Sequence, residues 1–427
     1  MSELTDPLRV EYGSELDGLR VVRHPPPPGA ASFSATYVGP AGWGFDPSGR
    51  TGTSRLVNQL IVAAAGRYDR VALARVLDRA GATIAHQSSP ESSEVTIWGP
   101  TTEWRRLIGV LSEVVLRPRF DPADVARVRR QMLEHQLRES AQPSPRADRE
   151  MLRAIFPVGH PYRETGLGDR RSLARITRAD LVRFHREHYT SGDALLVVTA
   201  SARLAAVERI ARERFGRFPQ STPPRLSVPT VPRPAASPTL IDLPGRAQVD
   251  IRIGGASLPR TDPAFPAAFL ANELLGGRPL LSRLFQRVRE RGGLAYHASS
   301  SLEAMRYGGF WVAQAGTGAD RWKKVVPMLT DEVARLDRST VSLKELRVIR
   351  ESAIGEIPLA VESTAEAHEL AVDLAYHRLP ADYWVRWPRL LRAIRPGEIR
   401  AAAQTALDGR RAVTVVVGPV DSAPAAP

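Results

Sequence analysis

The sequence predicts an α+β protein built from two homologous domains, each a mainly antiparallel sheet with helices packed on one face. Three observations lead to this class. The 427-residue chain is too long for one ordinary hydrophobic core. A proline-rich segment divides it nearly in half, and the order of strands, turns and helices before that segment returns after it.

The dividing segment, residues 219–238, reads PQSTPPRLSVPTVPRPAASP and has seven prolines in twenty positions. This composition is typical of a semi-rigid, extended linker. We therefore predict an N-terminal domain over residues 1–218 and a C-terminal domain over residues 239–427.

Each half begins with an alternating strand, a turn rich in Gly, Pro and Asp, and a helix. In the N-terminal half this passage is ASFSATYVGPAGWGFDPSGRTGTSRLVNQLI, and in the C-terminal half it is AQVDIRIGGASLPRTDPAFPAAFLANELLGG. A glycine turn, two alternating strands and a helix follow in each half, at residues 77–111 and 289–326.

Each half then contains a long amphipathic helix, at 121–139 and at 343–357, and ends in a β-rich run, ALLVVTAS or AVTVVVGP. A repeat of this length indicates two copies of one folding unit.

The net charge of +13 is carried almost entirely by arginine, because Lys323, Lys324 and Lys344 are the only lysines. The arginines lie among acidic residues, as in DLVRFHREH, without lysine-rich runs or interleaved stacking aromatics. We therefore predict no nucleic-acid partner. A basic surface would instead attract acidic peptides or an acidic partner subunit.

The absence of cysteine excludes disulfides, thiolate metal sites and thiol nucleophiles. No apolar run approaches 18 residues, so we predict no membrane span. The first residues, MSELTDPLRVEYGSELDGLR, include acids and no apolar stretch, which predicts a cytoplasmic location.

Three passages carry a resemblance that covers nearly the whole chain: GWGFDPSGRTG, HPYRETGLGDRRSLARITRADLVRFHREHYTSGDALLVV and LLSRLFQRVRERGGLAY. Together they resemble the pitrilysin/insulinase family of inverzincin metallopeptidases, particularly its mitochondrial-processing-peptidase-like branch. The resemblance implies one half of a clamshell that encloses a peptide.

The resemblance also implies where zinc would bind, because active members carry His-x-x-Glu-His on the first helix of the first half. The two histidines share a helix face and bind zinc, while the Glu serves as general base. The corresponding positions here are Arg55, Asn58 and Gln59, and the third-ligand position is His135. Guanidinium and amide groups cannot replace these ligands or the base. We therefore predict no metal in this chain, no activity of the chain alone, and zinc in a partner subunit.

Other histidines are weaker candidates for a metal site. His185 and His188 are three residues apart instead of four, and we interpret them as a helix C-terminus where the dipole favours cations. We expect His135 to be at the surface or an interface, and His160 to serve packing in a turn. No G-x-S-x-G signature indicates a serine nucleophile.

In the family, the domain that lacks zinc supplies an Arg and a Tyr seven residues apart, in a pattern similar to R-x-x-x-G-L-x-Y. Here Arg289 and Tyr296 match it. The resemblance implies that both side chains reach the partner's zinc site and donate hydrogen bonds to the scissile carbonyl. A plainer interpretation makes Arg289 a helix-end cation and Tyr296 a core aromatic. We expect Gly292 and Gly293 to allow a tight turn before the strand.

The segment Gly276-Gly277-Arg278 occupies the place where non-catalytic processing-peptidase subunits carry a longer glycine-rich loop that admits substrate. The alternative for this short copy is a helix C-cap and turn.

These observations favour the substrate-binding subunit of a bacterial, cytoplasmic, heterodimeric zinc endopeptidase. Its partner would be a family member with an intact His-x-x-Glu-His motif, and its substrate would be a peptide, with precursor peptides included. Two alternatives stay open: a purely structural scaffold, and a homodimeric peptide-binding pseudopeptidase without catalysis.

Overall fold

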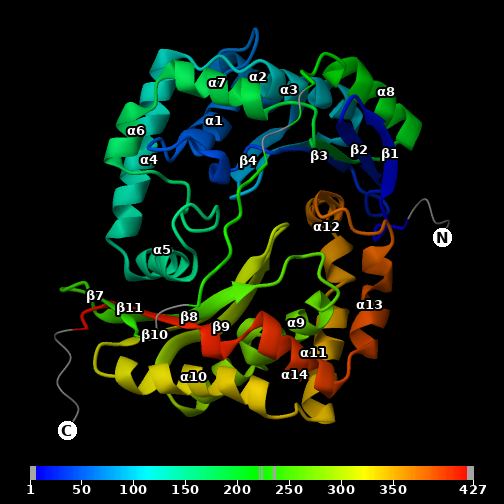
Figure 1. Ribbon diagram of the computed structural model, residues 1–427. Coiled ribbons are helices and arrows are strands. Elements are labelled where there is room, and N and C mark those ends of the chain that lie inside the picture. The colour runs from blue at the N-terminus through cyan, green and yellow to red at the C-terminus, as the bar shows by residue number, and fades with distance from the viewer. Residues whose placement is uncertain (1–5, 221, 223–224, 234–236, 421–427) are drawn as a thin grey trace. The chain divides into compact units, whose positions relative to one another are not determined.

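The computed structural model describes residues 6–220, 222, 225–233 and 237–420 (Figure 1). The chain packs as two compact units, and neither unit is one continuous segment. Unit 1 comprises Met1–Gln136, Thr165–Ser227 and Ile357–Arg386, and unit 2 comprises Leu137–Glu164, Val228–Glu356 and Trp387–Pro427. Of the predicted linker, positions 221, 223–224 and 234–236 lie outside the described residues, and the others form neither helix nor strand.

The sheet of unit 1 has six strands in the order β1-β2-β6-β3-β5-β4. All neighbouring strands run antiparallel except β2 and β6, which run parallel. The strands are β1 (Glu11–Leu16), β2 (Leu19–His24), β3 (Ser32–Gly39), β4 (Thr83–Ser88), β5 (Ser93–Pro100) and β6 (Leu195–Thr199).

The sheet of unit 2 has five strands in the order β7-β11-β8-β10-β9, with β7 and β11 as its parallel pair. Without β1, the two orders match strand for strand, so the predicted duplication is visible in the topology. The strands are β7 (Thr239–Asp242), β8 (Gln248–Ser257), β9 (Ala295–Ala304), β10 (Gly309–Gly318) and β11 (Val413–Gly418).

Helices surround both sheets. Those wholly in unit 1 are α1 (Thr53–Ile61), α2 (Arg70–Ala80), α3 (Trp104–Leu116), α6 (Arg170–Arg175), α7 (Arg178–His188), α8 (Leu204–Phe215) and α12 (Thr364–Tyr376). Those wholly in unit 2 are α5 (Pro143–Ile155), α9 (Phe265–Asn272), α10 (Trp322–Arg338), α11 (Leu343–Gly355) and α14 (Pro396–Ala406). Of the five boundaries between the units, two fall within helices, namely α4 (Pro122–Ser140) and α13 (Tyr383–Ala393).

The remaining helical segments are single turns or short π-helices. They are η2 (Trp43–Phe45), η3 (Thr101–Glu103), η4 (Glu273–Gly277), η5 (Phe285–Arg291), η6 (Leu359–Val361) and η7 (Gly409–Arg411). The π-helical segments η4 and η5 both lie in unit 2.

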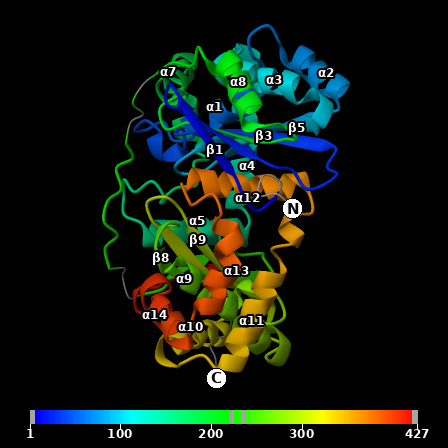
Figure 2. The ribbon, with the colours of Figure 1, turned by 90° about the vertical axis from the view of Figure 1, so that its right-hand side faces the viewer.

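The core of unit 1 lies between one face of its sheet and several helices. Phe33 and Ala35 of β3 point to this face and pack with Leu56 of α1, Leu107 of α3 and Leu181 of α7, all fully buried. Because side chains alternate along a strand, the intervening residues of β3 face the other way. That second face is covered by α12, as Figure 2 shows.

The sheet of unit 2 is covered in the same manner. Helices α9, α10 and α14 contact one face, and α5 covers the other. Met151 and Ile155 of α5 pack against Val312, Val415 and Val417 of the sheet.

The two helices on the second faces come from the opposite halves of the sequence. Helix α5 follows α4 in the predicted N-terminal domain yet packs in unit 2, whereas α12 follows α11 in the predicted C-terminal domain yet packs in unit 1. The compact units therefore differ from the predicted domains by two segments, 137–164 and 357–386. An apolar helix stripe predicts burial but does not say which sheet it covers.

In the part of the chain that the structure describes, no helix is both long and apolar enough to cross a membrane.

Candidate functional site

The helix that would carry a zinc motif, α1, is positioned by the turn before it. Gly52 adopts a left-handed conformation with φ of 103°, and the helix begins at the next residue. The Asp46 carboxylate accepts hydrogen bonds of 2.7 Å from the backbone N–H groups of Gly52 and of Ser54. Burial raises the pKa of Asp46 to about 7, although these hydrogen bonds oppose the rise. The passage GWGFDPSGRTG thus forms the N-terminal cap of the helix.

Asn58, at the position that the resemblance gives to the general base, is buried, and its side chain is hydrogen-bonded to residues of unit 1. Its side-chain amide donates to the Ser93 hydroxyl and, over 3.2 Å, to the Glu94 carbonyl. Its side-chain oxygen lies 2.9 Å from Nδ1 of His86. Burial, together with the charge of Arg55, lowers the pKa of His86, so a neutral imidazole donates this bond.

The hydrogen-bond network around Asn58 continues to Tyr189, whose hydroxyl lies 2.7 Å from that of Ser93. Burial raises the pKa of Tyr189 to about 12. His86, Ser93 and Tyr189 were not identified from the sequence, because they come from three elements and no local motif joins them. The network satisfies neutral polar groups and contains neither an ionised base nor a metal ligand set.

The other degenerate positions hold no better ligands. The Arg55 guanidinium carbon lies 4.8 Å from the centre of the Trp43 ring, in cation–π geometry. Gln59 is half-buried on α1. His135 is exposed on α4, as predicted, beside Glu134, which lies 4.0 Å from Arg130. Among the described residues, no three His, Asp or Glu side chains are grouped so as to hold a metal ion. The residues at these positions therefore do not fit a catalytic zinc.

Arg289 and Tyr296 lie on either side of the turn between η5 and β9. Gly293 has φ of 58°, a left-handed conformation that glycine adopts without strain, while Gly292 has ordinary helical geometry. Tyr296 is 70% exposed, so its interpretation as a core aromatic is wrong. Arg289 is also exposed, in the last turn of η5, with its guanidinium carbon 5.0 Å from the Phe285 ring.

The positive charge of Arg289 influences the pKa of His297, near the start of β9. Burial lowers the pKa of His297, the residue after Tyr296; Asp250 opposes this, and Arg252 and Arg289 lower it further. Arg289 and Tyr296 therefore flank the turn that leads into the β9 edge strand, and both side chains are exposed.

The segment Gly276-Gly277-Arg278 forms the end of η4 and its cap. A side chain at Gly276 would lie 2.3 Å from the Ser300 backbone nitrogen, so this glycine permits close packing on β9. Arg278 is buried and paired with Glu273 at 2.5 Å and with Glu356. These contacts support the C-cap alternative, and a role in admitting substrate stays a prediction.

The His185/His188 pair is structural, but the interpretation as dipole-stabilised cations is wrong. Both lie in the last turn of α7 and are hydrogen-bonded to carbonyls, His185 to Val115 at 2.8 Å and His188 to Pro40 at 3.2 Å. Burial lowers the pKa of His185 to about 4 and lowers that of His188 as well. Both rings are therefore neutral donors at pH 7.

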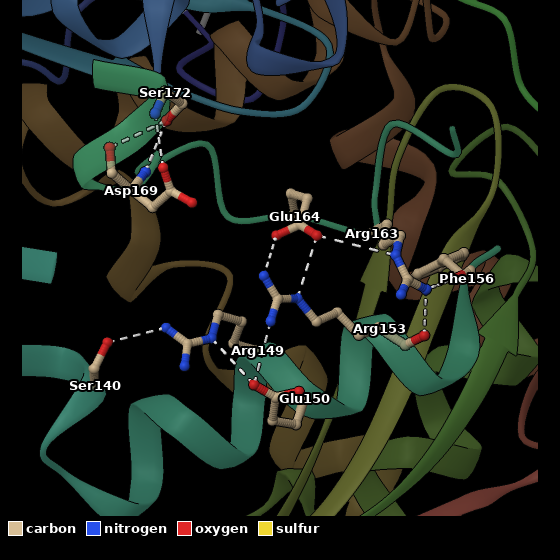
Figure 3. A network of polar contacts seen from close by, with 9 residues as sticks. All are labelled: Ser140, Arg149, Glu150, Arg153, Phe156, Arg163, Glu164, Asp169 and Ser172. Carbon is tan, nitrogen blue, oxygen red and sulfur yellow. Dashed lines mark hydrogen bonds and ion pairs between the residues drawn. The ribbon is translucent and has the colours of Figure 1, made fainter. Parts of the chain in front are cut away.

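The packing role predicted for His160 is confirmed. Its ring stacks on Phe156 with a centroid separation of 4.4 Å, and Nδ1 accepts from the Tyr162 backbone N–H at 3.1 Å. Figure 3 shows how the chain around this turn is tied to α5: Arg153 forms a bidentate pair with Glu164 at 2.9 and 3.2 Å. Arg163 donates to the Phe156 carbonyl at 2.6 Å. The same figure includes the Asp169–Ser172 capping box of α6, which belongs to unit 1.

Comparisons with known proteins point to one family. Residues 175–352 match the sequence profile of the Peptidase M16 inactive domain. An uncharacterized zinc protease of Mycobacterium leprae is 25% identical over 357 residues, covering 81% of this chain and 78% of that protein. One from Mycobacterium tuberculosis is 26% identical over 355 residues, with coverage of 82% and 79%. The uncharacterized zinc protease YmxG of Bacillus subtilis is 37% identical over 93 residues, 22% of each chain.

Solved structures show the same fold. The crystal structure of a peptidase M16 inactive domain from Pseudomonas fluorescens superposes with a TM-score of 0.90 at 23% identity, over 96% of this chain and 98% of that one. A protease from Helicobacter pylori superposes with a TM-score of 0.88 at 14% identity, over 96% and 99%. The α+β architecture with two antiparallel-rich sheets is therefore shown, and the matches together support the pitrilysin/M16 family.

Proposed function

We propose that this chain is the non-catalytic, substrate-binding subunit of a heterodimeric zinc metalloendopeptidase of the M16 family. One observation carries the proposal: Arg289 and Tyr296 are exposed together at one strand end, while the zinc positions of α1 hold Arg55, Asn58 and Gln59. The match to an inactive M16 domain and the names of the zinc-protease relatives support it.

The exposed pair has the chemistry to assist peptide hydrolysis in a partner's site. A phenol O–H and a guanidinium both donate hydrogen bonds, and neither needs to change protonation during the reaction. Aimed at the scissile carbonyl, they stabilise the negative charge that develops on its oxygen. The partner's zinc and its Glu would supply the activated water.

The position of Tyr296 on an edge strand supports one class of substrate. Tyr296 is the second residue of β9, which is the outermost strand of its sheet. An edge strand has unpaired backbone groups that recognise an extended peptide rather than a folded surface. We therefore propose peptides or unfolded segments as substrates, including precursor peptides, in the cytoplasm.

The experiment mixes the purified chain with a family member that carries an intact His-x-x-Glu-His motif. Cleavage of a quenched fluorogenic peptide library gives kcat and KM. Arg289→Ala and Tyr296→Phe should each lower kcat about 10²–10³-fold, the typical effect of losing one oxyanion donor. Heterodimer formation, measured by light scattering, should not change.

Arg291→Ala is the matched control, because Arg291 is an exposed cation in the same turn but lies outside the pattern. It should retain nearly full turnover. Unchanged kcat in both Arg289→Ala and Tyr296→Phe would disprove the role of the pair. Stoichiometric zinc binding and peptide cleavage by the chain alone would disprove the two-subunit assignment.

A further inference from the structure

A pocket on unit 1 is lined by five arginines, and it is separate from the features discussed above. The arginines are Arg67, Arg105, Arg106, Arg117 and Arg214. The cavity has a volume of about 550 Å³, within the range of small-molecule sites. Its lining residues come from α3 and the residue after it, from α8 and from the segment before α2. Helices α3 and α8 run side by side (Figures 1 and 2).

One face of α3 forms the floor of this arginine pocket. Arg105, Gly109 and Glu113 are spaced four residues apart along the helix, and Arg117 continues the series just after its end. Residues at this spacing lie above one another on a helix. Arg105 and Arg117 therefore arise from a single helical face and its extension, and Arg106, three residues before Gly109, lies beside that face.

The walls come from distant parts of the sequence. Arg214 of α8 packs against Gly109, since a side chain added there would meet its guanidinium at 3.5–3.6 Å. On another side, Arg67 donates to the Tyr68 hydroxyl at 2.8 Å and stacks over its ring at 5.0 Å. Gly66 allows Glu113 to approach, because a side chain there would overlap the Glu113 carboxylate.

Positive charge predominates in the arginine pocket. Five of its nine lining residues are arginines and one, Glu113, is acidic, whereas basic residues number 59 of 427 in the whole chain. Three carboxylates compensate the five arginines in part: Glu113 lies 3.7 Å from Arg117, Glu103 lies 3.0 Å from Arg106, and Glu213 lies 3.1 Å from Arg214. Of these acids, Glu113 lines the pocket, and Glu103 and Glu213 do not.

We propose that the arginine pocket binds an anion with two or more linked phosphate groups, such as tripolyphosphate or the triphosphate of a nucleotide. Guanidinium groups match phosphate oxygens in bidentate geometry, and several of them around one cavity suit several phosphates. Val110 and the Tyr68 ring are the main apolar lining, so the pocket offers little of the apolar surface that a peptide partner would bury. A compact polyanion fits this cavity better than an acidic peptide does.

The test is calorimetric titration of the full chain with tripolyphosphate, ATP and hexaglutamate, with sodium sulfate as the control for ionic strength, at about 150 mM salt. Arg214→Gln and Arg105→Gln should each weaken tripolyphosphate binding about tenfold or more, the effect of losing one charge-assisted hydrogen bond. Arg209→Gln is the matched control, because Arg209 is an exposed arginine of the same helix as Arg214 that does not line the pocket. It should bind within about twofold of the unmodified chain.

Equal affinity for tripolyphosphate and ATP would show recognition of the phosphate chain, and tighter binding of ATP would show that the nucleoside contributes; both outcomes support the proposal. The proposal would be overturned if tripolyphosphate bound no more tightly than sulfate. It would also be overturned if Arg209→Gln and Arg214→Gln lost equal affinity for tripolyphosphate. Hexaglutamate binding as tightly as tripolyphosphate would also overturn it, in favour of an acidic peptide. None of these outcomes depends on the peptidase assignment.

Discussion

Each half of the chain contains a helix–turn–strand passage with a left-handed glycine at the turn, and the two passages carry different side chains. In the first half, Gly81 joins α2 to β4 with φ of 59°; in the second, Gly293 joins η5 to β9 with φ of 58°. Both glycine N–H groups bond back into the preceding helix, to Asp78 at 3.1 Å and to Arg289 at 3.1 Å.

The residues that flank these two turns differ in kind. Leu77 is buried in the core of unit 1, and Ile84, seven residues later, packs against the same core. At the matching positions of unit 2, Arg289 and Tyr296 are exposed. Since the backbone turn forms with apolar residues in one copy, the fold does not require an arginine and a tyrosine in the other. This difference is the physical argument for a functional pair.

Helices α5 and α12, each of which covers the sheet of the opposite half of the chain, differ in the contacts that hold them. Helix α5 is held on its sheet by a buried arginine: Arg252 contacts Asp148 at 2.6 Å and the Ser144 hydroxyl at 2.6 Å. Helix α12 is held by neutral groups: His368 lies 2.7 Å from the Thr199 hydroxyl and 2.7 Å from that of Thr36. Equivalent helices are thus fixed by charge in one unit and by a neutral hydrogen-bond chain in the other.

The largest expected change in stability comes from removing Arg252, the buried cation that contacts α5. Arg252→Ala should lower the free energy of unfolding by about 3–5 kcal/mol, because Asp250, whose carboxylate lies 3.3 Å from Arg252, would stay buried without its cation. Asp148 is half exposed, so Asp148→Ala should cost no more than about 1 kcal/mol. Urea denaturation of both variants measures the difference, and equal losses would contradict it.

The next effect contrasts the two turns. Leu77→Ala should destabilise by about 2–4 kcal/mol, since it removes buried methyl groups from the core of unit 1. Arg289→Ala should stay within about 0.5 kcal/mol, because the side chain is exposed. Thermal unfolding of the two variants provides the comparison; a large loss in Arg289→Ala would assign that arginine a structural role.

A smaller change in stability is expected from His368 of α12, and it depends on pH. Burial and the nearby His24 lower the pKa of His368 to about 3. The folded chain therefore binds fewer protons than the unfolded chain below pH 6.5, and the contribution of His368 to stability is full above that pH and declines as the pH falls. Relative to the unmodified chain, His368→Gln should lose stability at pH 7, and this deficit should shrink by about 2 kcal/mol at pH 5.

The quantity to measure is the difference in free energy of unfolding between the unmodified chain and His368→Gln. Asp46, with a pKa raised to about 7, titrates in the same range in both proteins, so its contribution cancels. Urea midpoints at pH 7 and pH 5 provide the data. A deficit that is the same at both pH values would show that His368 is not buried as a neutral group.

The smallest effect tests whether the two turns are equivalent. Gly81→Ala and Gly293→Ala should each cost about 1 kcal/mol, because an alanine tolerates the left-handed conformation poorly. Neither site has a steric obstacle: the nearest atom to an added side chain lies 3.7 Å away at Gly81, and none lies within 4 Å at Gly293. Asparagine at either position should recover part of the loss. Clearly unequal losses would show that the turns are under different strain.

Much of this fold was predictable from the sequence, because local pattern determines local structure. The alternation in 31–40 and 247–258 gave β3 and β8, and the helices predicted at 121–139 and 343–357 are α4 and α11, within two residues at each end. Of the candidate site, the sequence showed that Arg55, Asn58 and Gln59 provide no zinc-ligand set, since such a set depends on residue types at fixed spacing.

The sequence by itself determined the duplicated elements, the glycine turns and the presence of Arg55, Asn58 and Gln59, which provide no zinc-ligand set, on the first helix. Only the tertiary structure decided that α5 and α12 cover the sheets of the opposite halves, that His185 and His188 are buried and neutral, that Tyr296 is in solvent and that five arginines form one pocket. The physical reason is that burial and charge environment arise from contacts between residues far apart in the chain, which periodicity does not encode.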